Sequence, residues 1–91
     1  MNSRDKNELG QRLKRIAGQI AGIQRMLDED RELVDVVTQV SAVRAALGSV
    51  ANILLVSHVE QCATAIVASQ SERERRQLAS ELTRLFEKRE I

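Results

Sequence analysis

One long apolar stretch, residues 33–69, constrains the fold of this chain more than any other feature. Its apolar side chains recur at alternating steps of three and four residues, a period typical of a helix packed against another helix. The valine content alone would also suit strands, but the only turn signal in the stretch, Gly48-Ser49, is weak. The stretch therefore predicts one helix of about 37 residues, roughly 55 Å long. The positions that carry the pattern are Leu33, Val36, Val40, Val43, Leu47, Val50 and Leu54.

A helix of this length is too long for a chain of 91 residues to cover by itself. A globular domain of that size has a radius of gyration of roughly 12 Å and is only about 30 Å across. The apolar surface at both ends of the helix therefore needs a second copy of the chain. The simplest arrangement is an antiparallel pair with a four-helix core. We predict an all-α fold in which residues 1–91 form a single domain.

Two shorter helices are expected on either side of the long one. A heptad pattern predicts a first helix from about Lys6 to Asp28, and either Asp28 or Asp30 would suit the N-cap of the helix that follows. Ser71 and Glu74 fit a capping box, S-x-x-E, at the start of a third, amphipathic helix. The apolar positions are Leu9, Leu13, Ile16, Ile20, Ile23 and Leu27 in the first helix, and Leu78, Leu82, Leu85 and Phe86 in the third.

The composition excludes several classes of function. The chain has one histidine, one cysteine, no tyrosine and no tryptophan, and it lacks a glycine-rich phosphate loop, so we predict that it is not an enzyme. A single cysteine cannot form an internal disulfide, which fits the reducing cytoplasm. The N-terminus is polar and does not resemble a signal peptide. No uncharged apolar run reaches the length of about 18 residues that a membrane span needs, so we expect no membrane partner.

The histidine and the cysteine form the first candidate site. His58 and Cys62 lie four residues apart in the string SHVEQC and so share one face of the long helix. A neutral imidazole and a thiolate can bind a soft ion such as Cu(I), or Zn(II) or Ni(II). The alternative is structural, with Cys62 packed as a small hydrophobic residue and His58 as a hydrogen-bonded interior residue. Spacing alone leaves both interpretations open.

A basic segment forms the second candidate site. Between Gly10 and Arg25 the chain carries four positive charges and no negative one, although its net charge is only +1. Such a local patch is typical either of phosphate binding or of an ordinary solvated helix face. No aromatic residue is interleaved with the cations, which argues against stacking on single-stranded nucleic acid.

Three strings resemble the CsoR/RcnR/FrmR family of bacterial transcriptional repressors: RLKRIAGQIAGIQRML, VTQVSAVRAAL and SHVEQC. The resemblance runs from about Leu9 through Ile66. It implies an antiparallel four-helix dimer that pairs into a homotetramer, and a repressor of double-stranded operator DNA that releases the DNA when an effector binds. It also implies that the DNA contacts lie on Arg12, Lys14 and Arg15, with Arg44 as a further contributor.

The copper-sensing branch of this family is the most similar, but one of its ligands is missing. That branch binds Cu(I) through a cysteine near the start of the second helix and through a histidine and a cysteine that correspond to His58 and Cys62. The first cysteine is replaced by Leu33. In an antiparallel dimer Leu33 is expected near His58 and Cys62 of the other chain. Cu(I) or another soft metal would then need a different donor, such as Glu32 or a small thiol.

The sequence therefore favours a cytoplasmic repressor that releases operator DNA when a Cu(I)-like ion binds an altered site. Three alternatives remain open. The protein could respond to oxidants or other thiol reagents through Cys62. It could be a repressor-like protein without a metal switch. It could also be a metal-binding helical protein with no DNA function.

Overall fold

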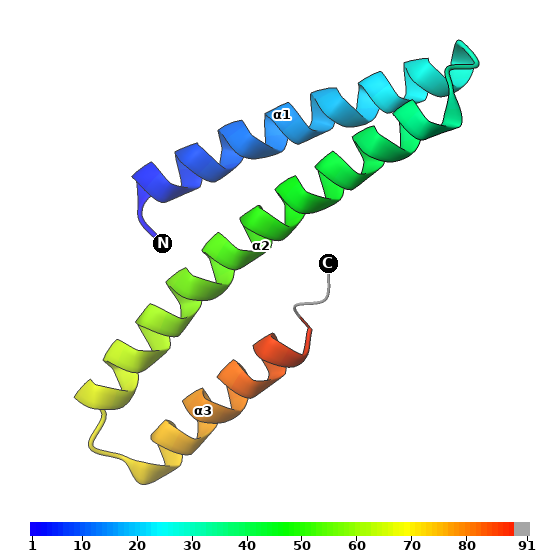
Figure 1. Ribbon diagram of the computed structural model, residues 1–91. Coiled ribbons are helices and arrows are strands. Elements are labelled where there is room, and N and C mark those ends of the chain that lie inside the picture. The colour runs from blue at the N-terminus through cyan, green and yellow to red at the C-terminus, as the bar shows by residue number, and fades with distance from the viewer. Residues whose placement is uncertain (89–91) are drawn as a thin grey trace. The chain divides into compact units, whose positions relative to one another are not determined.

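The computed structural model describes residues 1–88 and contains three α-helices in that range, with no strand (Figure 1). They are α1 (Ser3–Asp28), α2 (Leu33–Ala68) and α3 (Glu72–Glu87). The prediction of an all-α chain with three helices is confirmed, and the long helix has 36 residues. The chain divides into two compact units, Met1–Val50 and a second that begins at Ala51. The assignment of 1–91 to a single domain stays a prediction.

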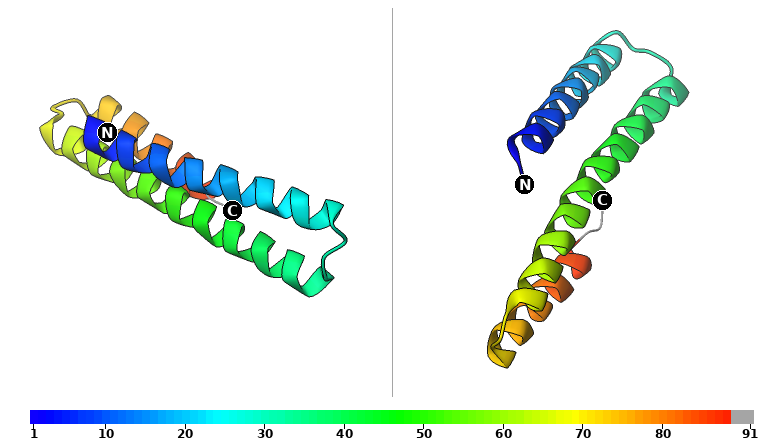
Figure 2. Two further views of the ribbon diagram at one scale, coloured as in Figure 1. Left: turned by 90° about the horizontal axis from the view of Figure 1, so that it is seen from above. Right: turned by 90° about the vertical axis from the view of Figure 1, so that its left-hand side faces the viewer.

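In the first unit, α1 lies antiparallel to residues 33–50 of α2 (Figures 1 and 2). Part of each predicted heptad stripe is buried between them. The buried side chains recur at every seventh residue, because seven residues correspond to almost two full helical turns. They are Leu9 and Ile16 on α1, and Val36, Val43 and Val50 on α2.

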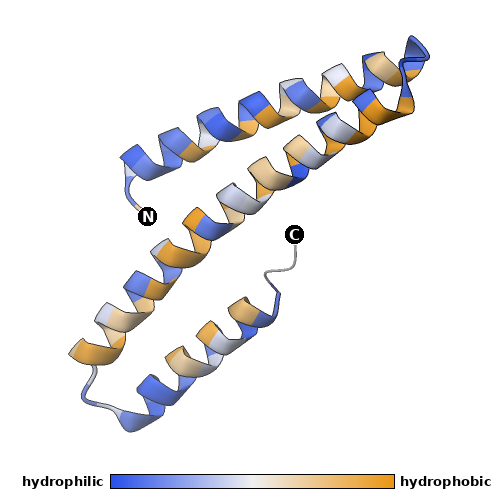
Figure 3. Ribbon diagram, in the orientation of Figure 1, coloured by the Kyte–Doolittle hydropathy of each residue, from blue (hydrophilic) through white to orange (hydrophobic). Residues whose placement is uncertain are grey.

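Other apolar side chains of the first unit are exposed, most of them on the same stripes. Between 46% and 75% of their surface is accessible. Figure 3 shows apolar residues along the whole length of α2 and at regular intervals along α1. The first unit therefore presents a second apolar face that it does not cover itself. That face includes Leu13, Ile20 and Leu27 on α1, and Leu33, Val37 and Val40 on α2.

Helix α1 ends in a Schellman motif. The N–H of Arg31 donates to the carbonyl of Met26 at 3.0 Å, and the N–H of Asp30 donates to the carbonyl of Leu27 at 3.2 Å. Asp30 adopts a left-handed backbone conformation, with φ of 54°. The predicted N-cap at Asp28 or Asp30 is therefore wrong, because both residues belong to the end of α1. The first hydrogen bond of α2 runs instead from the N–H of Val36 to the carbonyl of Glu32, at 3.2 Å.

Replacing Asp30 with glycine is expected to stabilise the protein. Glycine adopts a positive φ without the strain between Cβ and carbonyl that an aspartate carries there, although it loses more entropy on folding. We expect a net gain of about 0.5–1 kcal/mol in the free energy of unfolding, measured by urea denaturation at fixed protein concentration. As a control, Asp28→Gly lies in the last helical turn, where φ is helical, and should destabilise. Equal effects of the two substitutions would contradict this geometry of the turn.

In the second unit, α3 lies antiparallel to residues 51–68 of α2 (Figures 1 and 2). Leu55, Cys62 and Ser69 are buried and again lie seven residues apart. The predicted apolar stripe of α3 is partly buried at Leu78, Leu82 and Leu85. Cys62 is therefore part of the packed side of α2 in this unit.

Hydrogen bonds in the turn fix the start of α3 to the end of α2. Ser71 is the N-cap of α3, and its side chain accepts from the N–H of Glu74, as predicted. In a capping box the Glu74 carboxylate would in turn accept from the backbone N–H of Ser71. Here it accepts instead from the hydroxyl of Ser69 at 3.1 Å. Arg75 donates through two nitrogens to the carbonyl of Ser69, at 3.1 and 2.6 Å. This guanidinium caps the carboxyl end of α2, and so the turn has a defined geometry.

Helix α2 is long and apolar enough to cross a membrane by length and composition alone. Its most apolar window of 18 residues has a mean hydropathy of 1.6, and 17% of that window is buried within the chain. The core helix of a soluble protein passes the same test. Helix α2 therefore carries more apolar surface than this one chain covers.

Candidate functional site

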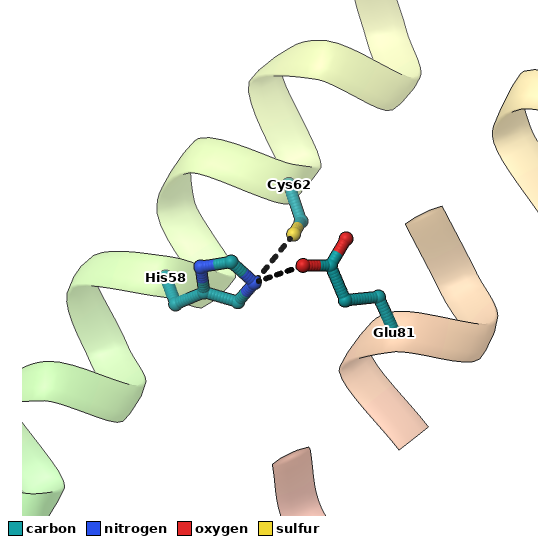
Figure 4. A group of neighbouring side chains, drawn as sticks. All are labelled: His58, Cys62 and Glu81. Atoms are coloured by element: carbon teal, nitrogen blue, oxygen red, sulfur yellow. Dashed lines mark hydrogen bonds and ion pairs between the residues drawn. The ribbon is translucent and has the colours of Figure 1, made fainter. Parts of the chain in front are cut away.

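The second unit brings together three side chains with metal-binding atoms: His58, Cys62 and Glu81 (Figure 4). His58 and Cys62 lie one turn apart on α2, and Glu81 reaches them from α3. The Sγ of Cys62 lies 3.4 Å from Nε2 of His58, and Oε1 of Glu81 lies 3.5 Å from the same nitrogen. All three donor atoms lie within 4.8 Å of one another. One nitrogen, one sulfur and one oxygen thus converge on a common point.

These separations fit the edges of a metal coordination sphere. With bonds of about 2.3 Å to sulfur and about 2.0–2.2 Å to nitrogen or oxygen, neighbouring ligand atoms of a tetrahedral ion lie about 3.4–3.6 Å apart. The two separations that involve Nε2 match this range. The residues present therefore fit a transition-metal ion, with the imidazole nitrogen between the other two donors.

Burial in this group rises from Glu81 to Cys62. The side chain of Glu81 is 47% exposed and that of His58 is 31% exposed, whereas Cys62 is 3% exposed. Both neighbours of Nε2 offer lone pairs, and a single N–H on that nitrogen can donate to only one of them. A bound cation would be attracted to all three atoms at once. The exposed side of the group, at Glu81, gives an ion a route in from solvent.

Glu81 was not predicted from the sequence, although a signal for it was present. Glu81 lies three residues after Leu78 and four before Leu85, on the apolar stripe that packs α3 against α2. A carboxylate on this side of an amphipathic helix lies close to the neighbouring helix, even though the side chain of Glu81 is 47% exposed. Its partner here is His58, which the pattern of each helix by itself could not reveal.

The donor proposed from the sequence, Glu32, is not part of this group. Glu32 is exposed just before α2, and its carbonyl accepts the first hydrogen bond of that helix. Leu33, which replaces the family's first cysteine, begins α2 and is 75% exposed. The expected position of Leu33 beside His58 and Cys62 of another chain stays a prediction, as does any role of Glu32 in metal binding.

The basic residues proposed for DNA contact lie in the first unit. Arg12 and Arg15 of α1 line an open groove of about 390 Å³ together with Ile16, Gln19, Ala45, Ala46 and Ser49. The far wall of the groove consists of small side chains from α2, Arg15 is exposed, and the side chain of Arg12 is 39% exposed. Arg12 also pairs weakly with Glu8 at 3.6 Å, on the surface. Lys14 and Arg44 are exposed but do not line the groove.

Comparison with known proteins gives consistent results. The model of a family described as metal-sensitive transcriptional repressor matches residues 5–88. The copper-sensing transcriptional repressor CsoR of Bacillus subtilis (strain 168) is 44% identical over 88 residues, which cover 96% of this chain and 83% of that protein. The copper-sensing transcriptional repressor RicR of Mycobacterium tuberculosis (strain ATCC 25618 / H37Rv) is 47% identical over 66 residues, which cover 72% and 69%.

A solved structure is also similar. The nickel-responsive transcriptional regulator InrS has a TM-score of 0.83 to this chain at 36% sequence identity, and the match covers 92% of this chain and 91% of that one. The three-helix architecture of this chain is therefore one that a solved metal-responsive regulator shares.

Proposed function

This chain belongs to the family of metal-sensitive transcriptional repressors, and we propose that a metal ion bound by His58 and Cys62 is what releases it from DNA. The family match confirms the resemblance to the CsoR/RcnR/FrmR repressors that the sequence showed. The protein is a metal-responsive transcriptional repressor and not an enzyme, and the family acts on operator DNA. Soluble repressors of this kind fit the cytoplasm.

The observation that carries the proposal is the convergence of donor atoms in the second unit. His58 and Cys62 were identified from their spacing, and Nε2 and Sγ lie 3.4 Å apart. The structural alternative requires only that Cys62 packs and that His58 finds a hydrogen-bond partner. That alternative accounts for Glu81 as an ion-pair partner of His58, and the match to a metal-sensitive repressor family is what favours metal binding over it.

For the DNA surface we propose Arg12, Lys14 and Arg15, with Arg44 as a further contributor. The support is the absence of acidic residues from Gly10 to Arg25, together with the exposure of Arg15 and the partial exposure of Arg12 in their shared groove. Arginine and lysine side chains bind phosphate oxygens strongly, and such contacts supply much of the affinity for DNA.

We propose that residues 1–91 act as one domain that assembles into an antiparallel dimer and then a tetramer. The first unit leaves Leu13, Ile20, Val37 and Val40 exposed, and a second copy of the chain would cover apolar surface of this kind. The uncovered apolar face of α1 and α2 is the surface available for that contact.

Placing a charge on this face is expected to dissociate the assembly. Val40 is 48% exposed in the chain, and Val40→Asp would put a carboxylate into the proposed interface without a partner. We expect the molar mass from sedimentation equilibrium to fall toward that of one chain. The dissociation constant of the assembly should rise at least about tenfold. The control Ser41→Asp adds the same charge at the next, exposed position. Two variants that both keep the wild-type mass would rule out this face as the interface.

The proposed function is tested with a labelled fragment of the protein's own promoter region. The metal-free protein should bind this fragment more tightly than a scrambled fragment of equal length, as measured by fluorescence anisotropy. Adding one equivalent of Zn(II), Ni(II) or, anaerobically, Cu(I) per chain should then release the DNA for at least one of these ions. A protein that holds its DNA equally well with each ion would be a repressor without a metal switch.

The alternative of an oxidant-responsive thiol has less support. Cys62 is 3% exposed, and reagents attack accessible thiolates. Mass spectrometry after mild oxidant treatment, without metal, should find Cys62 unmodified. Rapid modification together with DNA release would favour the thiol mechanism over the metal mechanism.

A further inference from the structure

We propose that Glu81 is the third metal ligand, and that this carboxylate makes the site selective for a divalent ion such as Zn(II), Ni(II) or Co(II) over Cu(I). The inference rests on the proposed function, in which His58 and Cys62 hold the effector. It adds the identity of the missing donor and the chemical class of the ion.

The chemistry of the donors favours a divalent ion. Cu(I) is a soft ion and is bound best by thiolates and thioethers, whereas carboxylates suit harder ions. The chain offers one thiolate, because Leu33 stands at the position of the family's first cysteine and Cys62 is the only cysteine. Imidazole, thiolate and carboxylate are each donor types that Zn(II) accepts.

The separation between Glu81 and His58 is that of two metal ligands. Oε1 of Glu81 lies 3.5 Å from Nε2 of His58. This distance is longer than an N–H···O hydrogen bond, which is about 2.7–3.2 Å. It is instead close to the separation of about 3.4 Å expected between nitrogen and oxygen ligands of one tetrahedral ion. The carboxylate therefore lies at ion-pair distance from a protonated imidazole, and the same separation fits two ligands of one ion.

Contacts along α3 hold Glu81 in position. Arg75 binds the carbonyl of Ser69, and Ser71 caps the first turn of α3. These contacts fix the start of the helix that carries Glu81. Glu81 therefore lies near His58 on a helix whose start is fixed. All three donors belong to a single chain. An ion bound there would link α3 to α2. The same side of α3 is held toward α2 by the packed residues Leu78, Leu82 and Leu85.

The experiment is a set of metal titrations on the reduced, full-length protein and on Glu81→Gln, which keeps the size of the side chain and removes its charge. Co(II) is the first probe, because its visible spectrum reports coordination geometry and its charge-transfer band reports the thiolate. Zn(II) is measured by competition with Co(II), and Cu(I) by anaerobic competition with a chromophoric chelator. The control is Glu87→Gln, on the same helix and exposed.

We expect Glu81→Gln to weaken Co(II) and Zn(II) binding at least tenfold and to change the visible Co(II) spectrum. Cu(I) affinity should change by less than about threefold, since a thiolate and an imidazole remain. Glu87→Gln should bind all three ions as the wild type does. A second variant, Glu81→Asp, guards against loss of the fold, and its circular dichroism should match that of the wild type while its Co(II) spectrum changes.

Two outcomes would overturn the proposal. One is a Glu81→Gln protein with wild-type Co(II) affinity and spectrum. The other is a Cu(I) affinity that falls as much as the Zn(II) affinity does. Failure of the proposed function would look different. In that case Glu81→Gln would still weaken Zn(II) and Co(II) binding, but none of the ions would change the affinity of the wild-type protein for its promoter DNA.

Discussion

Replacing Cys62 with alanine is expected to abolish the response to metal while leaving DNA binding intact. The thiolate is the strongest donor of the group, and without it an imidazole and a carboxylate remain. We expect metal affinity to fall at least about 100-fold, because outer-shell partners alone are worth about 10- to 100-fold. In anisotropy titrations the metal-free variant should bind the promoter fragment as the wild type does. Adding the ion that releases the wild type should then have no effect.

Alanine is the informative replacement because it separates the two interpretations of Cys62. Cys62 is 3% exposed, so a polar residue there would damage packing, whereas alanine keeps a small apolar side chain. If Cys62 only fills space, Cys62→Ala should still release DNA when metal is added. That result would remove the thiolate from the mechanism.

Replacing Arg12 and Arg15 together with alanine should weaken DNA binding at least about tenfold and flatten its dependence on salt. Removing one phosphate interaction reduces the slope of log affinity against log salt by about 0.9. The effect should be similar for promoter and scrambled DNA, since phosphate contacts carry no sequence information. The measurement is anisotropy at several salt concentrations. Metal affinity should not change, because neither residue belongs to the donor group.

The matched control for this variant is Arg73→Ala combined with Arg84→Ala. Both are exposed residues of α3, and the pair removes the same amount of charge from the chain. If the loss of bulk charge explained the effect, both double variants would lose affinity equally. A larger loss for Arg12 and Arg15 assigns the DNA contact to their groove. Wild-type affinity in the Arg12 and Arg15 variant would show that the DNA surface lies elsewhere.

The helices were predictable from the sequence because their signals are local. The period of apolar residues from Leu33 to Leu54 marks α2, and Ser71 with Glu74 marks the start of α3. The pair His58 and Cys62 was also predictable, since a spacing of four places both on one helix face. Only part of the heptad stripes of α1 and α2 proved to be buried within the chain. The division into buried and exposed positions depends on the neighbouring helix and could not be predicted from one stripe.

What the sequence could not supply depends on contacts between residues far apart in the chain. Glu81 is 19 residues after Cys62, and its approach to His58 depends on the turn that Ser69 and Arg75 define. The end of α1 at Asp28 was predicted correctly, but the N-cap of α2 was misjudged. Aspartate is a common N-cap, but Asp30 adopts a positive φ. Aspartate adopts a positive φ less readily than glycine does, so an aspartate in the sequence gives no clear signal of this conformation.

The central claim is that metal binding at His58 and Cys62 is coupled to DNA binding, and the most direct test is reciprocity. If Zn(II) weakens the affinity for the promoter fragment by some factor, the bound fragment must weaken the affinity for Zn(II) by the same factor. We would measure Zn(II) affinity by competition with a chelator, with the protein free and then saturated with DNA. We predict weaker Zn(II) binding on the DNA, by about 5- to 150-fold. Equal Zn(II) affinity in the two states would contradict the coupling.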